Sequence, residues 1–168
     1  LIVGMHPGGS RRWKTKRWDL ARWAQLCDAL TQRNVHVVVT GGPEERALGE
    51  ELARRTQHPP QLLIGQTSLA ELACVLRACH AFLAHDSATL HLAAAVGTPT
   101  VVLFGPTDPK RHLPPSFTGQ ASRVIWASSS SAFSAPSLPH RSTASRRDDV
   151  STLIARLRGR AGAARHSR

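Results

Sequence analysis

Seven consecutive residues, His85 to His91, include an aspartate, a serine, a threonine and two histidines. The apolar run before them and the helical pattern after them predict a turn between a strand and a helix. Backbone N–H groups at a helix start, together with the helix dipole, attract an anion such as pyrophosphate. Because Ser87 and Ala88 have small side chains, a ligand could approach that backbone. This segment is therefore the first candidate for a binding site.

Two other interpretations of the segment remain open. Asp86 and Ser87 could simply cap the helix, as these residue types often do. A Ser-His-Asp hydrolase would use the same residue types, but the G-x-S-x-G motif of such enzymes is absent here. A metal site is not indicated, because His80 and His85 have no nearby carboxylate at a recognised ligand spacing.

A glycine-rich loop with several cations, residues 7–18, follows the first expected strand. Its backbone N–H groups and a lysine could hold phosphate oxygens. The G-x-x-x-x-G-K-[ST] spacing of a P-loop is missing, and a solvated basic loop is the simpler alternative. Trp13 and Trp18 are expected to pack on the helix that follows.

Two further expected strand ends carry polar residues. Gly41 and Gly42 would keep the end of the second strand open, and a glutamate beside them could accept hydrogen bonds from a ribose or a base. A plain turn with an acidic helix start is the alternative interpretation. Thr67 would lie at the end of the third strand.

The elements that position these residues alternate between strands and helices up to about residue 115. Strands are expected over residues 1–6, 35–40, 62–64, 81–84 and 100–104, and helices over 20–30, 44–55, from 69 onward and over 89–96. Asp19 is a predicted N-cap, and Ser68 to Glu71 form a predicted capping box. The alternation predicts an α/β fold, a Rossmann-like open parallel sheet with helices on both faces. Such sheets bind ligands at the carboxyl ends of their strands, where the polar segments fall.

The periodic pattern weakens after residue 115. We predict an α/β domain over 1–115, a Ser- and Pro-rich linker or disordered segment over 116–146, and a short helix with a basic tail over 147–168. Because Leu1 already begins an expected strand, the chain is expected to be a piece of a longer protein.

Composition narrows the classes of protein further. The chain has 168 residues, of which 41% are hydrophobic, enough for the core of one domain. No apolar run reaches the roughly 18 residues of a membrane span, and no signal peptide is visible. The net charge of +11 belongs mostly to the tail: residues 1–121 have 13 Lys and Arg against 9 Asp and Glu, and residues 122–168 have 9 against 2. Cys27, Cys74 and Cys79 are expected to be small buried thiols in a reducing compartment.

Four strings occur together in one order: HPGGS…WKTKRW at 6–18, TGGPEE at 40–45, TSLAEL at 67–72, and HDSxxxHLAAAxGTPxVxLFGPTDP at 85–109. In this order and spacing the sequence resembles the lipopolysaccharide heptosyltransferases of glycosyltransferase family 9. The resemblance covers about residues 1–112. It implies the GT-B architecture of two Rossmann-like domains, of which this chain would be the C-terminal, donor-binding half.

The resemblance also implies roles for single residues. Lys16 resembles the lysine that neutralises the donor phosphate, Glu44 the residue that contacts the adenosine, and Thr67 the residue that lines the adenine pocket. Asp86 resembles the aspartate that binds the sugar, and the backbone after it would hold the pyrophosphate. The implied substrate-binding residues are Ser10, Lys16, Glu44, Thr67, Asp86, Ser87, Ala88, Thr89 and His91. Ala88 replaces the usual glycine of the family, which narrows the approach to the phosphate.

The implied activity is transfer of heptose from ADP-heptose to the inner core of lipopolysaccharide, with inversion and without a metal or another cofactor. The general base is expected in the N-terminal domain of the same enzyme, so this chain alone is expected to transfer nothing. The implied partners are the nucleotide-sugar donor, the lipopolysaccharide acceptor and that domain, with no nucleic acid. The implied location is the cytoplasm, including the inner face of the inner membrane.

Three alternatives are kept. The chain could belong to a family member with another sugar donor or acceptor, or be a non-catalytic module that binds an adenine nucleotide. It could also bind nucleic acid or a membrane surface through its basic tail. This last alternative is disfavoured, because the arginines after residue 140 are not interleaved with aromatic residues and no nucleic-acid-binding motif occurs.

Overall fold

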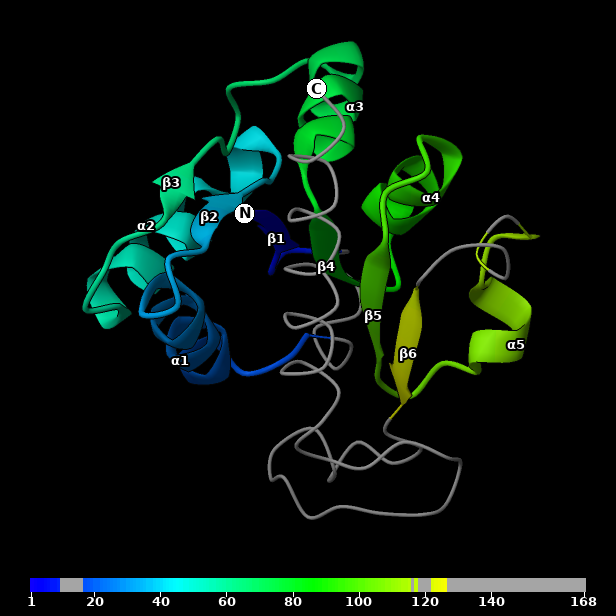
Figure 1. The fold of residues 1–168 in the computed structure, drawn as a ribbon. Helices are drawn as coiled ribbons and strands as arrows, with labels where there is room; N and C mark the ends of the chain where they lie inside the picture. The colour runs from blue at the N-terminus through cyan, green and yellow to red at the C-terminus, as the bar shows by residue number, and fades with distance from the viewer. Residues whose placement is uncertain (10–16, 116, 118–121, 127–168) are drawn as a thin grey trace, which may run out of the picture.

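A six-stranded sheet forms the centre of the structure, a computed structural model that describes residues 1–9, 17–115, 117 and 122–126 (Figure 1). Each neighbouring pair of strands in it is parallel. The strands are β1 (Ile2–His6), β2 (His36–Val39), β3 (Gln61–Leu62), β4 (Ala81–His85), β5 (Thr100–Phe104) and β6 (Arg123–Trp126). The helices are α1 (Leu20–Thr31), α2 (Arg46–Arg55), α3 (Leu69–Ala78), α4 (Ala88–Ala95) and α5 (Pro109–His112), with a 3₁₀ turn, η2, over Pro43–Glu45.

The strand order is β3-β2-β1-β4-β5-β6. The chain therefore builds the sheet from β1 to one edge, returns to place β4 on the other side of β1, and continues to the opposite edge. In register, Met5 of β1 lies between Val39 of β2 and Leu83 of β4. This doubly wound order leaves a crevice at the carboxyl ends of β1 and β4, where the direction of building reverses.

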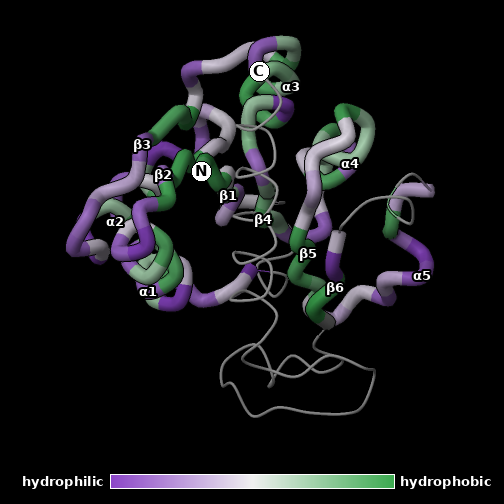
Figure 2. Tube along the Cα trace, viewed as in Figure 1, coloured by the Kyte–Doolittle hydropathy of each residue, from purple (hydrophilic) through white to green (hydrophobic). Residues whose placement is uncertain are grey.

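Helices cover both faces of the sheet, as the sequence predicts. On one face, Trp23, Cys27 and Leu30 of α1 join a core cluster with alternate residues of the strands, among them Met5 and Leu83. On the other face, α3 and α4 pack on the intervening strand residues, and Leu76, Phe82, Ala84 and Ala93 form a second cluster. Figure 2 shows apolar residues along the central strands between the helices. Burial on both faces explains why these strands lack a polar alternation.

The helix starts follow the predicted capping signals. The Asp19 carboxylate accepts a hydrogen bond from the Ala21 amide at 2.8 Å and begins α1. Ser68 and Glu71 form the predicted capping box of α3. The helix predicted over 44–55 begins later, at Arg46, because Pro43–Glu45 form a 3₁₀ turn. The Glu45 side chain accepts from the Gly42 amide in that turn.

The structure places a strand inside the predicted linker. Arg123–Trp126 form β6 in parallel with β5, and the Ser122 hydroxyl accepts a hydrogen bond from the Thr100 amide at 3.0 Å. Four residues just before a Ser-rich stretch carry too little periodicity to predict a strand, and the edge of β5 supplies the pairing partner. Helix α5 was also not predicted, although Asp108 caps it and Pro109 occupies its first turn. The segment 147–168 lies outside the described residues.

The cysteine prediction is correct for two of the three residues. Cys27 and Cys79 are buried, and burial raises the pKa of Cys27 to about 12 and that of Cys79 to about 11. Cys74 is exposed, because it lies on the face of α3 that points away from the sheet. Trp18 packs edge-on against Trp23 with ring centroids 5.3 Å apart, which confirms its predicted contact with α1. Trp13 lies outside the described residues.

We predict that Ser122→Ala lowers the free energy of unfolding by about 1–2 kcal/mol. The substitution leaves the buried Thr100 amide without its acceptor, which typically costs about 1–3 kcal/mol. Urea unfolding followed by tryptophan fluorescence measures the change. Ser122→Thr keeps a hydroxyl and is the matched comparison. Equal stability of Ser122→Ala and the parent chain would contradict the role given to this bond.

Candidate functional site

Three neighbouring strands, β2, β1 and β4, end side by side at the crevice of the sheet. A pocket of about 570 Å³ lies at these ends. It is lined by His6, Gly9, Gly42, Glu44, Glu45, Ser87, Ala88 and Thr89. Three separate polar segments of the sequence therefore meet in one place, as expected for the carboxyl ends of parallel strands.

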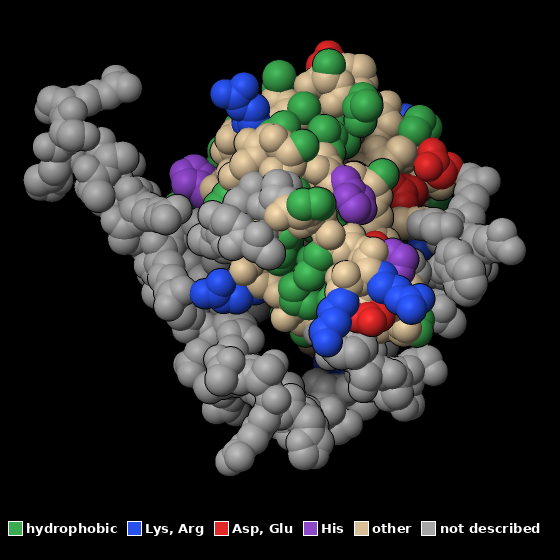
Figure 3. Space-filling model, turned by 90° about the vertical axis from the view of Figure 1, so that its right-hand side faces the viewer, with side chains coloured by type: hydrophobic (Ala, Val, Ile, Leu, Met, Phe, Trp, Pro, Cys, Tyr) green, Lys and Arg blue, Asp and Glu red, His purple; other side chains and the backbone are tan. Residues whose placement is uncertain are grey.

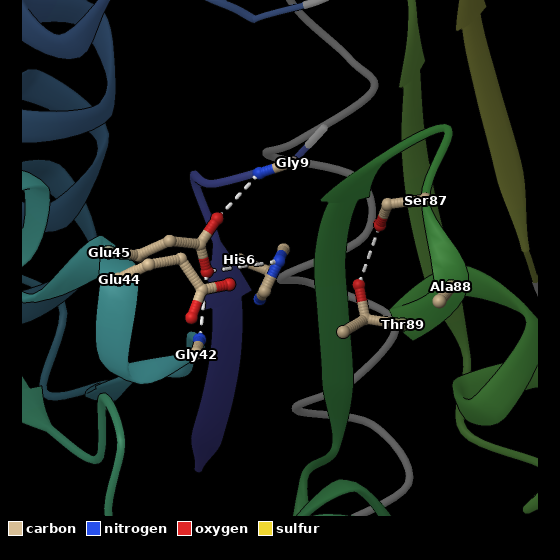
Figure 4. A pocket seen from close by; sticks show the side chains of 8 residues that line it. All are labelled: His6, Gly9, Gly42, Glu44, Glu45, Ser87, Ala88 and Thr89. Atoms are coloured by element: carbon tan, nitrogen blue, oxygen red, sulfur yellow. Dashed lines mark hydrogen bonds and ion pairs between the residues drawn. The ribbon is translucent and has the colours of Figure 1, made fainter. Parts of the chain in front are cut away.

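The two sides of the pocket have opposite electrostatic character. Figure 4 shows Glu44 and Glu45 on one side and Ser87, Ala88 and Thr89 on the other, with His6 between them. Carboxylates accept hydrogen bonds from hydroxyl groups. A helix start offers N–H donors and the positive end of a dipole. The pocket can thus take a ligand with hydroxyl groups at one end and an anionic group at the other.

The start of α4 is open toward the pocket. Ser87 is the N-cap residue by position, but its side chain makes no capping hydrogen bond. Its hydroxyl lies 2.8 Å from the Thr89 hydroxyl instead. The interpretation of Ser87 as a plain helix cap is therefore wrong. The Ser87 side chain thus leaves this first turn uncapped: the Leu90 amide donates to the Ser87 carbonyl oxygen at 3.1 Å, and Ala88, the first residue of α4, is exposed.

Asp86 lies directly before α4, and its carboxylate contacts residues that follow β5. Its Oδ2 accepts a hydrogen bond from the Thr107 hydroxyl at 3.1 Å and lies 4.0 Å from Nδ1 of His112. The Asp86 side chain is only 8% exposed and is not among those that line the pocket. Residues of the segment after β5 thus orient this carboxylate next to the pocket.

Glu45 connects two loops beneath the pocket. Its Oε1 accepts from the Gly9 amide at 2.7 Å, and its Oε2 accepts from the Gly42 amide at 2.9 Å. The same Oε2 lies 3.7 Å from Nε2 of His6. His6 is buried, which lowers its pKa, while the Glu45 charge opposes that shift. The carboxylate is therefore part of the wall of the pocket.

His85, the last residue of β4, holds the loop that follows β1. Its Nδ1 lies 3.1 Å from the Gly8 carbonyl oxygen, and its Nε2 accepts from the Trp18 amide at 2.8 Å. The first contact needs a donor and the second needs an acceptor, so the ring is neutral with its proton on Nδ1. Burial lowers the pKa of His85 to about 4, which favours the same form.

The predicted site residues are only partly brought together. Glu44, Ser87, Ala88 and Thr89 line the pocket, and Asp86 lies beside it. Two predicted residues are absent from the lining: Thr67 is half-buried in the segment before α3, and His91 is exposed on α4. Ser10 and Lys16 lie outside the described residues.

Sequence reasoning missed four residues of the site: His6, Glu45, His85 and Thr107. The sequence predicts Glu45 as part of an acidic helix start, His6 as the end of a strand and His85 as part of a turn, whereas His85 is the last residue of β4. The spacing S/T/G-x-x-E before a helix signals a carboxylate that turns back onto backbone amides. The contacts of His85 join residues 67 and 77 positions apart, and no local signal contains them.

We predict that the stability of the chain falls as the pH is lowered from about 6.5 to about 4. In this window the unfolded state takes up a proton on His85 that the folded state excludes, because burial lowers the pKa of His85 from 6.5 to about 4. The shift corresponds to a loss on the order of 3 kcal/mol. Urea unfolding at pH 7 and at pH 5 measures the first part of this loss, about 2 kcal/mol. His85→Gln should show a shallower dependence, with a remainder from buried His6; equal slopes would refute the assignment.

The described residues hold neither a metal-binding cluster nor a membrane-spanning helix. No group of three or more His, Cys, Asp and Glu side chains there could hold a metal ion. None of the helices in the same part of the chain has the length and apolarity to cross a bilayer.

The sequence was compared with known proteins. It matches glycosyltransferase family 9 (heptosyltransferase) over residues 2–136. Lipopolysaccharide heptosyltransferase 3 of Escherichia coli is 41% identical over 96 residues, which are 55% of this chain and 28% of that protein. Lipooligosaccharide heptosyltransferase 2 of Haemophilus influenzae is 33% identical over 74% of this chain and 37% of its own length. The chain thus spans about a third of the relatives it matches.

A solved structure agrees with this assignment. The ADP-heptose lipopolysaccharide heptosyltransferase II of E. coli superposes with a TM-score of 0.66 at 29% identity, over 74% of this chain and 38% of that one. The family match covers residues 2–136 and so includes the whole doubly wound sheet and the segments that line the pocket. The chain belongs to glycosyltransferase family 9 (heptosyltransferase).

Proposed function

We propose that this chain is the donor-binding part of a glycosyltransferase that transfers heptose from ADP-heptose to the inner core of lipopolysaccharide. The observation that carries the proposal is the two-sided pocket, in which the uncapped start of α4 faces Glu44 and Glu45. The diphosphate would lie at α4 and the ribose hydroxyl groups near the carboxylates. Two of the relatives reported above are named lipopolysaccharide heptosyltransferases, and the name of one of them also includes ADP-heptose.

The proposed chemistry is displacement of ADP from the anomeric carbon with inversion. Negative charge grows on the leaving diphosphate as the bond to the sugar breaks. N–H groups aimed at that charge stabilise the transition state without reorganising. The start of α4 would supply such groups, and Lys16 would add a positive charge. The reaction then needs no metal ion.

Asp86 would hold the sugar. Its orientation by Thr107 and its position next to α4 put a carboxylate beside the diphosphate end of the pocket. Glu44, exposed on η2, would contact the adenosine, and Thr67 the adenine. The general base that activates the acceptor hydroxyl would come from an N-terminal domain facing the crevice. The acceptor is the lipopolysaccharide inner core, and the enzyme would work in the cytoplasm and at the inner face of the inner membrane.

A binding module without transfer activity is the second candidate, because the pocket alone could bind a nucleotide whether or not transfer follows. A nucleic-acid or membrane-surface binder is the third candidate, and the basic tail on which it would depend lies outside the described residues from position 127 onward. On the face shown in Figure 3, the described Lys and Arg side chains lie among apolar and acidic side chains and form no single basic patch. The two family-based candidates share the donor pocket, so binding is tested first.

We predict that the chain binds ADP in a saturable manner and that UDP binds much more weakly. Lys16→Ala should weaken ADP binding about tenfold or more, because a hydrogen bond to a charged group contributes about 1.5–3 kcal/mol. Isothermal titration calorimetry measures both affinities. Glu50→Gln, an exposed change on α2, is the control. Absence of ADP binding by the folded chain would rule out the proposed donor pocket.

A transfer assay separates the two candidates once ADP binding is established. The chain is combined with the N-terminal part of its parent protein, ADP-heptose and a heptose-deficient lipopolysaccharide acceptor. We expect transfer that is lost in Asp86→Ala. Binding without transfer would favour the non-catalytic module.

A further inference from the structure

The carboxylate of Glu45 is nearly enclosed by glycine backbone. Its side chain is 10% exposed, and its two oxygens accept from the Gly9 and Gly42 amides at 2.7 and 2.9 Å. These amides belong to the loops after β1 and after β2, which are far apart in sequence. One ionised group therefore ties two loops of the pocket wall together, and hydrogen bonds to a charged acceptor are among the stronger ones.

Two glycines beside Glu45 leave the space that its carboxylate occupies. A Cβ on Gly8 would overlap the Glu45 Oε1 atom. A Cβ on Gly41 would lie 2.8 Å from Oε2, closer than real Cβ contacts. The two Gly-Gly pairs of the sequence, at 8–9 and 41–42, thus face each other across one side chain. The space that Glu45 needs is a reason for glycine at positions 8 and 41 that does not involve a ligand.

Two more side chains hold the same loop. Arg17 donates to the Gly9 carbonyl oxygen at 2.7 Å, so the carbonyl group and the amide group of Gly9 are both hydrogen-bonded to side chains. His85 binds the Gly8 carbonyl oxygen and the Trp18 amide, which lie at the two ends of the loop. Gly9 has a φ of +146°, a conformation that favours glycine. Side chains from η2 and β4 therefore hold Gly8 and Gly9 beside the pocket, in a backbone conformation that glycine adopts readily.

We infer that Glu45 is a positioning residue of the donor pocket: it fixes Gly9 and Gly42 as the pocket wall and so sets the affinity for a nucleoside diphosphate. The inference rests on the proposed function. It differs from the role of Glu44, which is an exposed neighbour on the same turn and would contact the ligand itself. Glu45 has both oxygens occupied by backbone and acts through the loops that it joins.

Two different changes should have the same effect. Glu45→Gln keeps the size of the side chain but turns one of the two acceptors into a donor, so one amide loses its partner. Gly8→Ala keeps the charge but pushes a methyl group into the carboxylate. We expect each variant to raise the Kd for ADP about tenfold, with a combined effect in the double variant smaller than the product of the two. Glu50→Gln should leave the Kd unchanged.

Amide hydrogen exchange separates positioning from a loss of stability. In both variants the Gly9 and Gly42 amides should exchange faster, while the Phe82 amide, which donates to Pro99 inside the sheet, keeps its rate. Unchanged exchange at Gly9 together with weaker ADP binding in Glu45→Gln alone would mean direct ligand contact and would overturn the inference. Faster exchange of Phe82 as well would also overturn it, since the effect would then be global.

If the proposed function is wrong, ADP binding and the amide exchange rates give a different combination of results. If the parent chain binds no ADP, the donor pocket is refuted, and the exchange rates alone decide the holding role of Glu45. Unchanged rates at Gly9 and Gly42 in Glu45→Gln then overturn that role. Normal ADP affinity in both variants of a chain that binds ADP overturns the inference and leaves the proposed function standing.

Discussion

The reversal of strand order between β1 and β4 is the constraint on which the rest of the structure depends. Because both strands are parallel and adjacent, the segments after them leave toward opposite faces of the sheet. Backbone and polar groups at that point cannot be covered by either helix layer. Side chains, water or a ligand satisfy them instead, and this is consistent with polar residues from distant segments meeting in one pocket.

Two ionisable side chains satisfy this requirement in opposite ways. Glu45 remains charged and uses backbone amides as its partners, which is how a carboxylate tolerates burial. His85 loses its charge and uses one nitrogen as a donor and the other as an acceptor. Both hold the loop after β1, whereas the start of α4 is left open. Side chains thus hold the loop on the carboxylate side of the pocket, whereas the start of α4, on the side that suits an anion, has no cap from the Ser87 side chain.

The local elements of the sheet could be predicted because their signals lie within a few residues. The apolar run 35–40, the Asp19 cap and the Ser68–Glu71 capping box each formed the expected element. Strand β6 could not, since its four residues become a strand only by pairing with β5. The exposure of Cys74 depends on which face of α3 meets the sheet, and a short apolar helix does not specify that.

The same distinction between local signals and long-range contacts applies to the candidate site. The sequence by itself determined the fold class, the family and the residues at three strand ends, because motif spacing and periodicity are properties of neighbouring positions. Only the tertiary structure decided that Glu45 and His85 support the loop, that Ser87 leaves α4 uncapped and that Thr67 and His91 stand outside the pocket lining. Those contacts join residues distant in the chain, and a hydrogen bond exists only once folding brings its donor and acceptor within about 3 Å.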